Sequence, residues 1–179
     1  PAMTVPSILL NSQTRIPQLG FGVFQIDPSD TVEAVLHAFE VGYRHIDTAQ
    51  MYGNEREVGQ AIAKSGLPRD EIFVTSKLNN SNHEPDDVRS TFAGTLDALG
   101  LDRIDLFLIH WPLPTRYGGD YVSTWSTMAE LAQSGRASAV GVSNFQPDHL
   151  RRIIEATGVV PAVNQVEVHP YFTNEDVRR

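Results

Sequence analysis

The chain has 179 residues and a mass of 19.8 kDa, and its 41% hydrophobic and 20% charged residues are typical of a folded globular domain. A formal net charge of −8 argues against nucleic acid or an anionic membrane surface as a partner, although a local basic pocket for a phosphate stays compatible with it. The absence of cysteine excludes disulfides, thiolate metal sites and thiol catalysis.

Targeting signals are not recognisable in the sequence. No apolar run approaches the roughly 20 residues of a transmembrane helix, and no signal peptide is visible, so we expect a cytoplasmic protein with no membrane partner. Pro1 and Ala2 precede Met3 and are expected to come from an expression vector, so the fold prediction sets them aside.

In chain order, apolar and β-branched runs alternate with segments of helical periodicity. A short hairpin is expected first, with strands at residues 8–10 and 14–16. The strands expected after it are residues 19–23, 45–47, 72–76, 104–109, 137–142 and 162–168. The helices expected between these strands are residues 31–41, 55–64, 85–99, 121–133 and 147–156, and a last helix begins near Asn174.

This alternation gives six strand–helix units, the sixth incomplete, and predicts a parallel sheet. We expect an α/β fold, a (β/α)₈ TIM barrel of which the chain covers about the first six βα units. The rival is a doubly wound open sheet, but Gly20-Phe21-Gly22 supplies only half of its G-x-G-x-x-G motif. Because a barrel closes with eight strands, residues 1–179 are expected to form one barrel domain that is incomplete at its C-terminal end.

Polar residues follow four of the predicted strands at nearly constant intervals. Asp47, Lys77, His110 and Ser143 are separated by 30, 33 and 33 residues. A barrel of roughly 250 residues uses about 31 residues per unit, and side chains at the C-terminal ends of its strands meet at one mouth. The spacing therefore predicts a shared active site, whereas each residue alone is explained as readily by capping, solvation or packing.

Three of these residues, together with Tyr52, suit proton delivery to a carbonyl group. An ammonium such as that of Lys77 favours the phenolate of a nearby tyrosine, and Asp47 would hold the lysine charged and in place. His110 could orient and polarise a carbonyl oxygen by donating a hydrogen bond. Because no side chain supplies hydride, this chemistry would need a nicotinamide cofactor.

Motifs around these residues also resemble those of a known family. They are residues 42–49 (GYRHIDTA), Tyr52, 53–55 (GNE), 58–59, 75–78 (TSKL), 106–112 (LFLIHWP), 141–145 (GVSNF) and 164–170 (NQVEVHP). In this order, across nearly the whole chain, they resemble the aldo-keto reductases, and bacterial enzymes similar to 2,5-diketo-gluconate reductase are the nearest branch.

The resemblance implies reduction of aldehydes or ketones to alcohols with NADPH, NADH being possible. Tyr52 matches the family's proton donor, Lys77 and Asp47 its relay, and His110 its carbonyl-orienting residue. Ser143, Asn144 and Gln165 match residues that bind the nicotinamide carboxamide, and Gly22 and Asp47 complete the expected cofactor set. By themselves, Ser143 and Asn144 are equally compatible with a helix cap before Pro147, and Gln165 with a buried amide.

The resemblance also implies a substrate pocket lined by Phe24, Met51 and Trp111, for which ordinary packing is the alternative. One departure is Asn79, which stands where the family commonly has tryptophan two residues after its lysine, and which would open or polarise the pocket. A second is that the seventh and eighth units, which carry further cofactor contacts, lie beyond Arg179. Arg178 and Arg179 are therefore expected on a solvated face.

We thus expect an NAD(P)H-dependent oxidoreductase acting on a small carbonyl substrate, monomeric when complete, with activity of the isolated 179 residues a separate question. A non-catalytic nicotinamide-binding or regulatory protein on the same scaffold is the alternative. Metal-dependent hydrolysis is disfavoured, because the six histidines form no paired ligand motif and no metal site is expected.

Overall fold

A single parallel sheet organises the chain. The computed structural model describes residues 4–179, and the expectation for Pro1 and Ala2 lies outside them. Six strands pair side by side in chain order, each parallel to the next: β3 (Phe21–Gly22), β4 (His45–Asp47), β5 (Phe73–Leu78), β6 (Ile104–Ile109), β7 (Ala137–Ser143) and β8 (Asn164–Gln165). A doubly wound sheet reverses its strand order, and this one does not.

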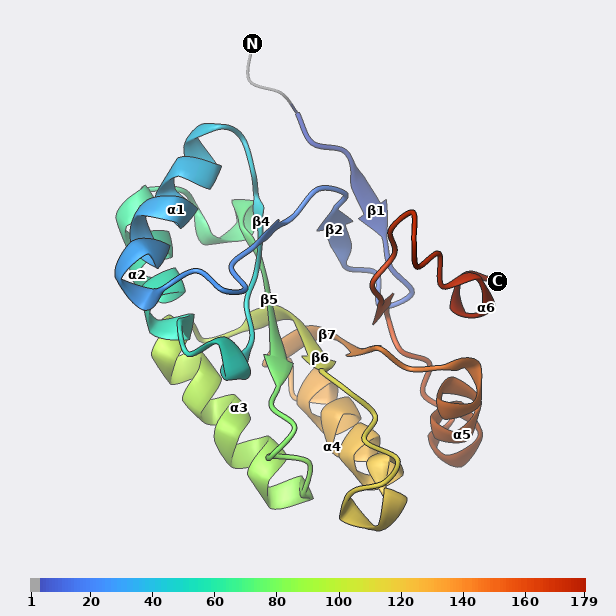
Figure 1. Cartoon of the computed structure of the whole chain (residues 1–179). Coiled ribbons are helices and arrows are strands. Elements are labelled where there is room, and N and C mark those ends of the chain that lie inside the picture. Colours follow the sequence, from blue (N-terminus) through green and yellow to red (C-terminus); the bar gives the residue numbers. More distant parts are fainter. Residues whose placement is uncertain (1–3) are drawn as a thin grey trace.

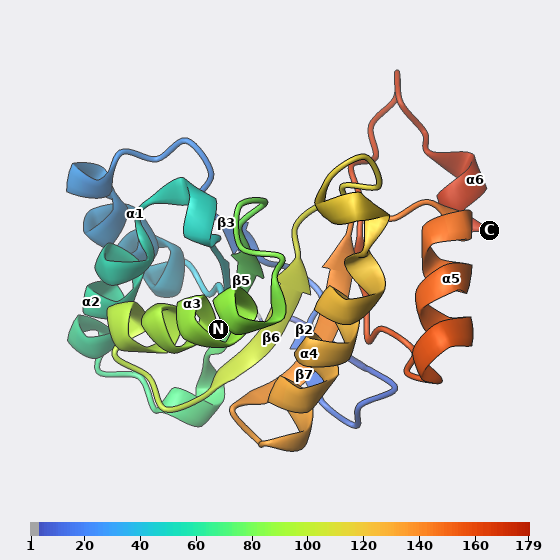
Figure 2. The same cartoon turned by 90° about the horizontal axis from the view of Figure 1, so that it is seen from below.

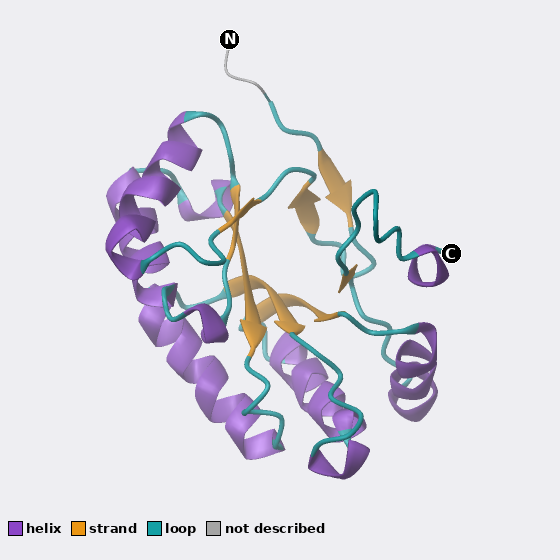
Figure 3. Ribbon diagram, in the orientation of Figure 1, coloured by secondary structure: helices purple, strands orange, loops and turns teal. Residues whose placement is uncertain are grey.

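The sheet curls around a centre and carries its helices on the outside (Figures 1 and 3). The helices are α1 (Pro28–Glu40), α2 (Glu55–Ser65), α3 (Pro85–Leu99), α4 (Tyr121–Gln133), α5 (Pro147–Thr157) and α6 (Glu175–Arg178). Three short 3₁₀ turns are η1 (Gln50–Tyr52), η2 (Arg69–Glu71) and η3 (Tyr117–Gly119). The fold prediction is confirmed: the chain forms the first six units of a (β/α)₈ barrel. That these units are one incomplete domain stays a prediction.

Side chains alternate between the two faces of the sheet. Outward-facing residues pack with the helices seen around the sheet in Figure 2, as Phe107 of β6 does against Phe92 of α3. On the inner face, a smaller apolar cluster contains Leu10, Phe73, Leu106, Leu108 and Ala139. Leu10 belongs to the predicted hairpin, which the structure contains as antiparallel β1 (Ser7–Leu9) and β2 (Arg15–Pro17), and it directly follows β1. The hairpin thus packs against the inner face.

Three predicted elements differ most in extent from the observed ones, and the other unequal bounds differ by one or two residues. Helix α1 begins at Pro28 rather than at residue 31, because Asp27 caps it by accepting a hydrogen bond from the Ser29 amide and Pro28 has the φ that a first helical residue needs. Strand β3 covers only residues 21–22 of the predicted 19–23, and β8 only residues 164–165 of the predicted 162–168, so both predicted strands were too long at each end. Both lie at the edges of the sheet, where a strand has a hydrogen-bonding neighbour on one side only.

Within residues 4–179, none of the helices has the length and apolarity needed to cross a membrane.

Candidate active site

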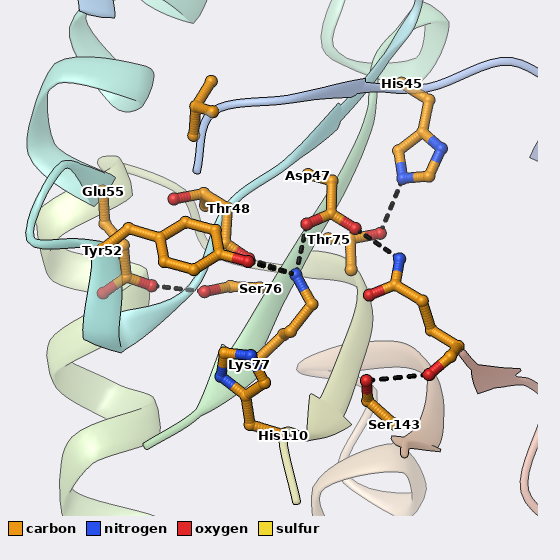
Figure 4. Close-up of polar contacts among 12 residues, drawn as sticks. His45, Asp47, Thr48, Tyr52, Glu55, Thr75, Ser76, Lys77, His110 and Ser143 are labelled. Carbon is orange, nitrogen blue, oxygen red and sulfur yellow. Dashed lines mark hydrogen bonds and ion pairs between the residues drawn. The ribbon is translucent and has the colours of Figure 1, made fainter. Parts of the chain in front are cut away.

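The C-terminal ends of β4 and β5 bring Asp47 and Lys77 into direct contact. Lys77 lies on the inner face of β5, its side chain 2% exposed, and its Nζ forms a close ion pair with Asp47 Oδ1 (Figure 4). The same Nζ donates to the Thr48 carbonyl oxygen at 3.1 Å. Because a buried ammonium is costly unless it is paired and hydrogen-bonded, these oxygens keep Lys77 charged at this depth.

Tyr52 completes the coordination of this ammonium. It lies in the 3₁₀ turn η1 that follows β4, and Lys77 Nζ is 3.4 Å from its hydroxyl oxygen and 5.2 Å from its ring centroid. The Phe24 ring packs on one side, with centroids 5.1 Å apart, and the His110 ring lies edge-on at 6.0 Å. The turn therefore brings a residue that is off the strand period to the strand-end cluster.

His110 follows β6 and is buried. Burial, and then the charge of Lys77, lower its pKa from 6.5 to about 4, with Asp47 opposing the shift. At neutral pH the imidazole is therefore uncharged and has one N–H to donate. Its Nδ1 is buried without a hydrogen-bond partner among residues 4–179. A neutral imidazole of this kind can donate a hydrogen bond to a carbonyl oxygen without transferring a proton to it.

The expected cofactor residues lie beside this cluster. Ser143 Oγ donates to the Gln165 carbonyl oxygen at 2.9 Å, and Gln165 Nε2 donates to Asp47 Oδ2 at 2.7 Å. Asn144, in the left-handed region at φ +60°, donates from Nδ2 to the His110 carbonyl oxygen at 3.1 Å. Neither Ser143 nor Asn144 caps α5, because Gln146 and His149 form that cap.

An open cavity of about 450 Å³ lies between the edge strands β3 and β8, and Gly22, Asp47, Tyr52, Lys77 and Gln165 are among its lining residues. Two further strands would close an eight-stranded barrel at this gap, so the volume follows from the open sheet and does not by itself define a ligand pocket. Gly22 lies exposed on its edge strand, and a Cβ atom there would meet nothing within 4 Å.

The three residues expected to line the substrate pocket are all exposed to solvent. Phe24 is 58%, Met51 47% and Trp111 44% exposed. Phe24 touches the site through its contact with Tyr52, while Met51 and Trp111 are chain neighbours of Tyr52 and His110. None of the three lines the 450 Å³ cavity.

The sequence interpretation missed the buried polar residues that surround the site. Thr48 donates to Asn54 Oδ1 at 2.9 Å, and Asn54 Nδ2 donates to the Val23 carbonyl oxygen at 3.1 Å. Asn54 stands at the N-cap position of α2, where asparagine usually caps the helix, but its side chain makes no cap hydrogen bond. Its side chain instead bonds Thr48 and the Val23 carbonyl oxygen. Across residues 4–179, no three His, Asp or Glu side chains gather where they could hold a metal ion.

Comparisons with known proteins match the chain to a single protein family. The family model described as "Aldo/keto reductase family" matches residues 18–179. An aldo-keto reductase of Mycobacterium sp. (strain KMS) is 47% identical over 176 residues, which cover 98% of this chain and 63% of that protein. A D/L-glyceraldehyde reductase of Hypocrea jecorina is 45% identical over 94% of this chain and 58% of its own length.

A solved structure agrees with these relatives. The Bombyx mori aldo-keto reductase in complex with NADP superposes with a TM-score of 0.91 at 40% identity, covering 98% of this chain and 62% of that one. The chain therefore belongs to the aldo/keto reductase family, and it spans less than two thirds of the length of these relatives.

Proposed function

We propose that the protein carrying this chain is an NAD(P)H-dependent oxidoreductase that reduces small aldehydes or ketones to alcohols, with Tyr52 as the proton donor. The observation that carries this proposal is the position of Lys77 Nζ, paired with the Asp47 carboxylate and 3.4 Å from the Tyr52 hydroxyl. Family membership and the NADP bound to the Bombyx mori relative support it.

In the proposed mechanism, the substrate carbonyl oxygen lies between the Tyr52 hydroxyl and the His110 imidazole. His110 is neutral at pH 7 because burial keeps its pKa near 4, so it donates an N–H bond and orients the carbonyl. Tyr52 transfers its hydroxyl proton to the carbonyl oxygen as negative charge develops there. The phenolate left behind is stabilised by Lys77, which Asp47 holds in its charged form.

The nicotinamide cofactor supplies the hydride for this reaction. The residues that would hold its ring and carboxamide are Gly22, Ser143, Asn144 and Gln165, of which Gly22 and Gln165 line the cavity and Ser143 bonds the Gln165 carbonyl oxygen. Gln165 Nε2 already bonds Asp47 Oδ2, so this amide lies at the edge of the proton relay. NADPH is the favoured cofactor, with NADH possible, and a cytoplasmic monomer is the expected form.

The second candidate, a non-catalytic cofactor-binding protein, needs no proton relay. A pure binder has no use for a buried ammonium between a carboxylate and a phenol, because that charge is expensive to bury. The relay geometry therefore favours the enzyme.

The test uses the protein in its complete native sequence, NADPH deuterated at the transferred position, and a panel of small aldehydes that includes D- and L-glyceraldehyde. We expect one alcohol per NADPH consumed, with deuterium on the former carbonyl carbon. Tight NADPH binding without turnover on any member of the panel would instead support the binder, and product hydrogen taken from solvent would contradict hydride transfer.

A further inference from the structure

A second polar network lies on the outer face of β5, between the sheet and helices α2 and α3. It consists of Gln50, Glu55, Ser76 and Thr95, here called the outer network. Ser76 and Thr95 are buried, and Gln50 and Glu55 are half-buried. Because β5 alternates its side chains, Ser76 points away from the cavity while its neighbour Lys77 points into it. The mechanism above uses none of these four side chains.

Gln50 connects the turn that carries Tyr52 to the end of β5. Its Oε1 accepts hydrogen bonds from the Asn79 backbone amide at 2.8 Å and from Asn82 Nδ2 at 3.0 Å. Its Nε2 donates to Thr95 Oγ1 of α3 at 3.1 Å. The Gln50 amide group is thus held from both sides, so η1 is fixed to the strand end and to a helix.

Glu55 makes the corresponding connection on the other side of Tyr52. Ser76 Oγ donates to Glu55 Oε2 at 2.6 Å, a contact visible behind Tyr52 in Figure 4. Thr95 Oγ1 donates to Glu55 Oε1 at 3.3 Å. Burial raises the pKa of Glu55, and the two hydroxyl donors oppose that rise. Burial therefore disfavours the charge of this carboxylate, and the two hydroxyl hydrogen bonds stabilise it.

The packing of α2 on α3 makes this meeting possible. Gly59 is one turn after Glu55, and Leu99 is one turn after Thr95. A Cβ atom at Gly59 would lie 2.4 Å from the Leu99 carbonyl oxygen, closer than any side chain tolerates. Glycine thus allows the two helices to approach until Glu55 and Thr95 are in hydrogen-bond reach.

We propose that the outer network sets the separation of Tyr52 and Lys77, and that Gln50, Glu55 and Thr95 are positioning residues for proton delivery. Gln50 and Glu55 flank Tyr52 in the chain and bond Asn79 and Ser76, which flank Lys77. Thr95 bonds both Gln50 and Glu55 and so holds these two links together. This inference rests on the proposed function. An error of about 1 Å in such a site can cost roughly 100-fold in rate, so a fixed Tyr52–Lys77 distance has catalytic value.

Thr95→Val tests this proposal, because it removes the central hydroxyl with little change in volume. In the complete native protein we expect kcat to fall about 10-fold, while the aldehyde KM and the NADPH Kd change less than about twofold. Thr95→Ser keeps the hydroxyl and should restore the wild-type kcat.

The matched control is Thr127→Val. Thr95 and Thr127 are each 2% exposed, but Thr127 Oγ1 donates only to the Ser123 carbonyl oxygen within α4. We expect this control to keep the wild-type kcat. Equal losses in both threonine variants would reduce the effect to general destabilisation and overturn the proposal.

Amide hydrogen exchange gives a measurement that does not depend on turnover. Since Gln50 Oε1 protects the Asn79 amide, exchange at Asn79 should accelerate in Thr95→Val and not in Thr127→Val. Unchanged exchange at Asn79 would refute the network whether or not the protein is an enzyme. If the wild type reduces aldehydes and Thr95→Val matches it, the positioning role fails while the proposed function stands. If the wild type shows no turnover, the proposed function fails and the positioning role fails with it.

Discussion

The two ends of strand β5 present opposite kinds of residue on the same inner face. Phe73, near the amino end, packs in the inner apolar cluster and against the His45 ring, with centroids 4.9 Å apart. Lys77, four residues later at the carboxyl end, binds Asp47, Thr48 and Tyr52. One strand thus contributes packing at one end and chemistry at the other, as barrel enzymes generally do.

The amino end of the sheet is also tied together by a charged pair. Asp105 Oδ2 accepts from the Val74 amide at 2.8 Å and from Arg69 Nη2 at 2.7 Å. Arg69 also donates to the carbonyl oxygens of Ile72 and Arg103. These contacts join β5 to β6 at the amino end of the sheet, so we expect changes here to affect stability and changes at Lys77 to affect turnover.

The largest expected effect is at the carboxyl end. Lys77→Met keeps an unbranched side chain of similar length but removes the ammonium, so kcat should fall by about 10²- to 10⁴-fold. NADPH binding, measured by fluorescence titration, should be retained. The exposed Lys64 of α2 provides the control, since Lys64→Met should leave kcat unchanged. A Lys77→Met protein with more than a tenth of the wild-type kcat would contradict the relay.

The next effect is at the amino end of the same strand. Phe73→Ala removes a buried ring from the inner cluster and should lower the free energy of unfolding by about 3–5 kcal/mol. Chemical denaturation measures this loss. For the fraction that stays folded, kcat should remain within about twofold of wild type; a selective loss of kcat with unchanged stability would reverse the assignment of the two ends.

Asp105→Asn should have a smaller effect. The amide oxygen can still accept from Val74, but the charge partner of Arg69 is lost, and we expect a cost of about 1–3 kcal/mol in unfolding free energy. Asp86→Asn is the matched control, because Asp86 pairs with Arg89 on the solvent-exposed surface. Equal denaturation midpoints for the two variants would show that the Arg69–Asp105 pair adds nothing.

The smallest effect concerns acid stability. Burial, followed by the charge of Arg116, lowers the pKa of His83 from 6.5 to about 4, as burial does for His110. Between pH 6.5 and 4 the unfolded chain binds more protons than the folded one. The contribution of these neutral histidines to the free energy of unfolding is therefore fully present above pH 6.5 and is lost as the pH falls towards 4.

His83→Phe should reduce that loss, because one of the histidines with a lowered pKa is removed while a ring that can stack on Tyr117 is kept. Thermal unfolding at several pH values measures the slope. A wild-type slope in the variant would show that His83 does not contribute.

Local sequence signals predicted much of this fold and part of the site. The bounds of β4, α3, β6 and α4 match those predicted, and Gly100 ends α3 in the left-handed conformation at φ +66°. The short edge strands β3 and β8 were overestimated, since their ends depend on neighbouring strands rather than on local composition. Gln50 and Thr95 are 45 residues apart, and no local pattern reports a hydrogen bond between them.

The strand period predicted that Asp47, Lys77 and His110 would meet, because each ends a strand of the same sheet. Tyr52 is off that period; acid–base reasoning paired it with Lys77, and the motif resemblance matched it to the family's proton donor. Its position depends on η1, which is held by the Asn79 backbone amide just after β5 and by the Thr95 side chain of α3. The site therefore combines three residues at regularly spaced strand ends with one residue, Tyr52, whose position depends on tertiary contacts.

The most direct test of the central claim is Tyr52→Phe in the complete native protein, with NADPH consumption and alcohol formation measured alongside NADPH affinity. Phenylalanine keeps the ring against Phe24 and His110 and removes only the hydroxyl that would give the proton. We predict a loss of kcat of at least about 10²-fold with NADPH Kd unchanged. Wild-type turnover by Tyr52→Phe would contradict the assignment of Tyr52 as the proton donor.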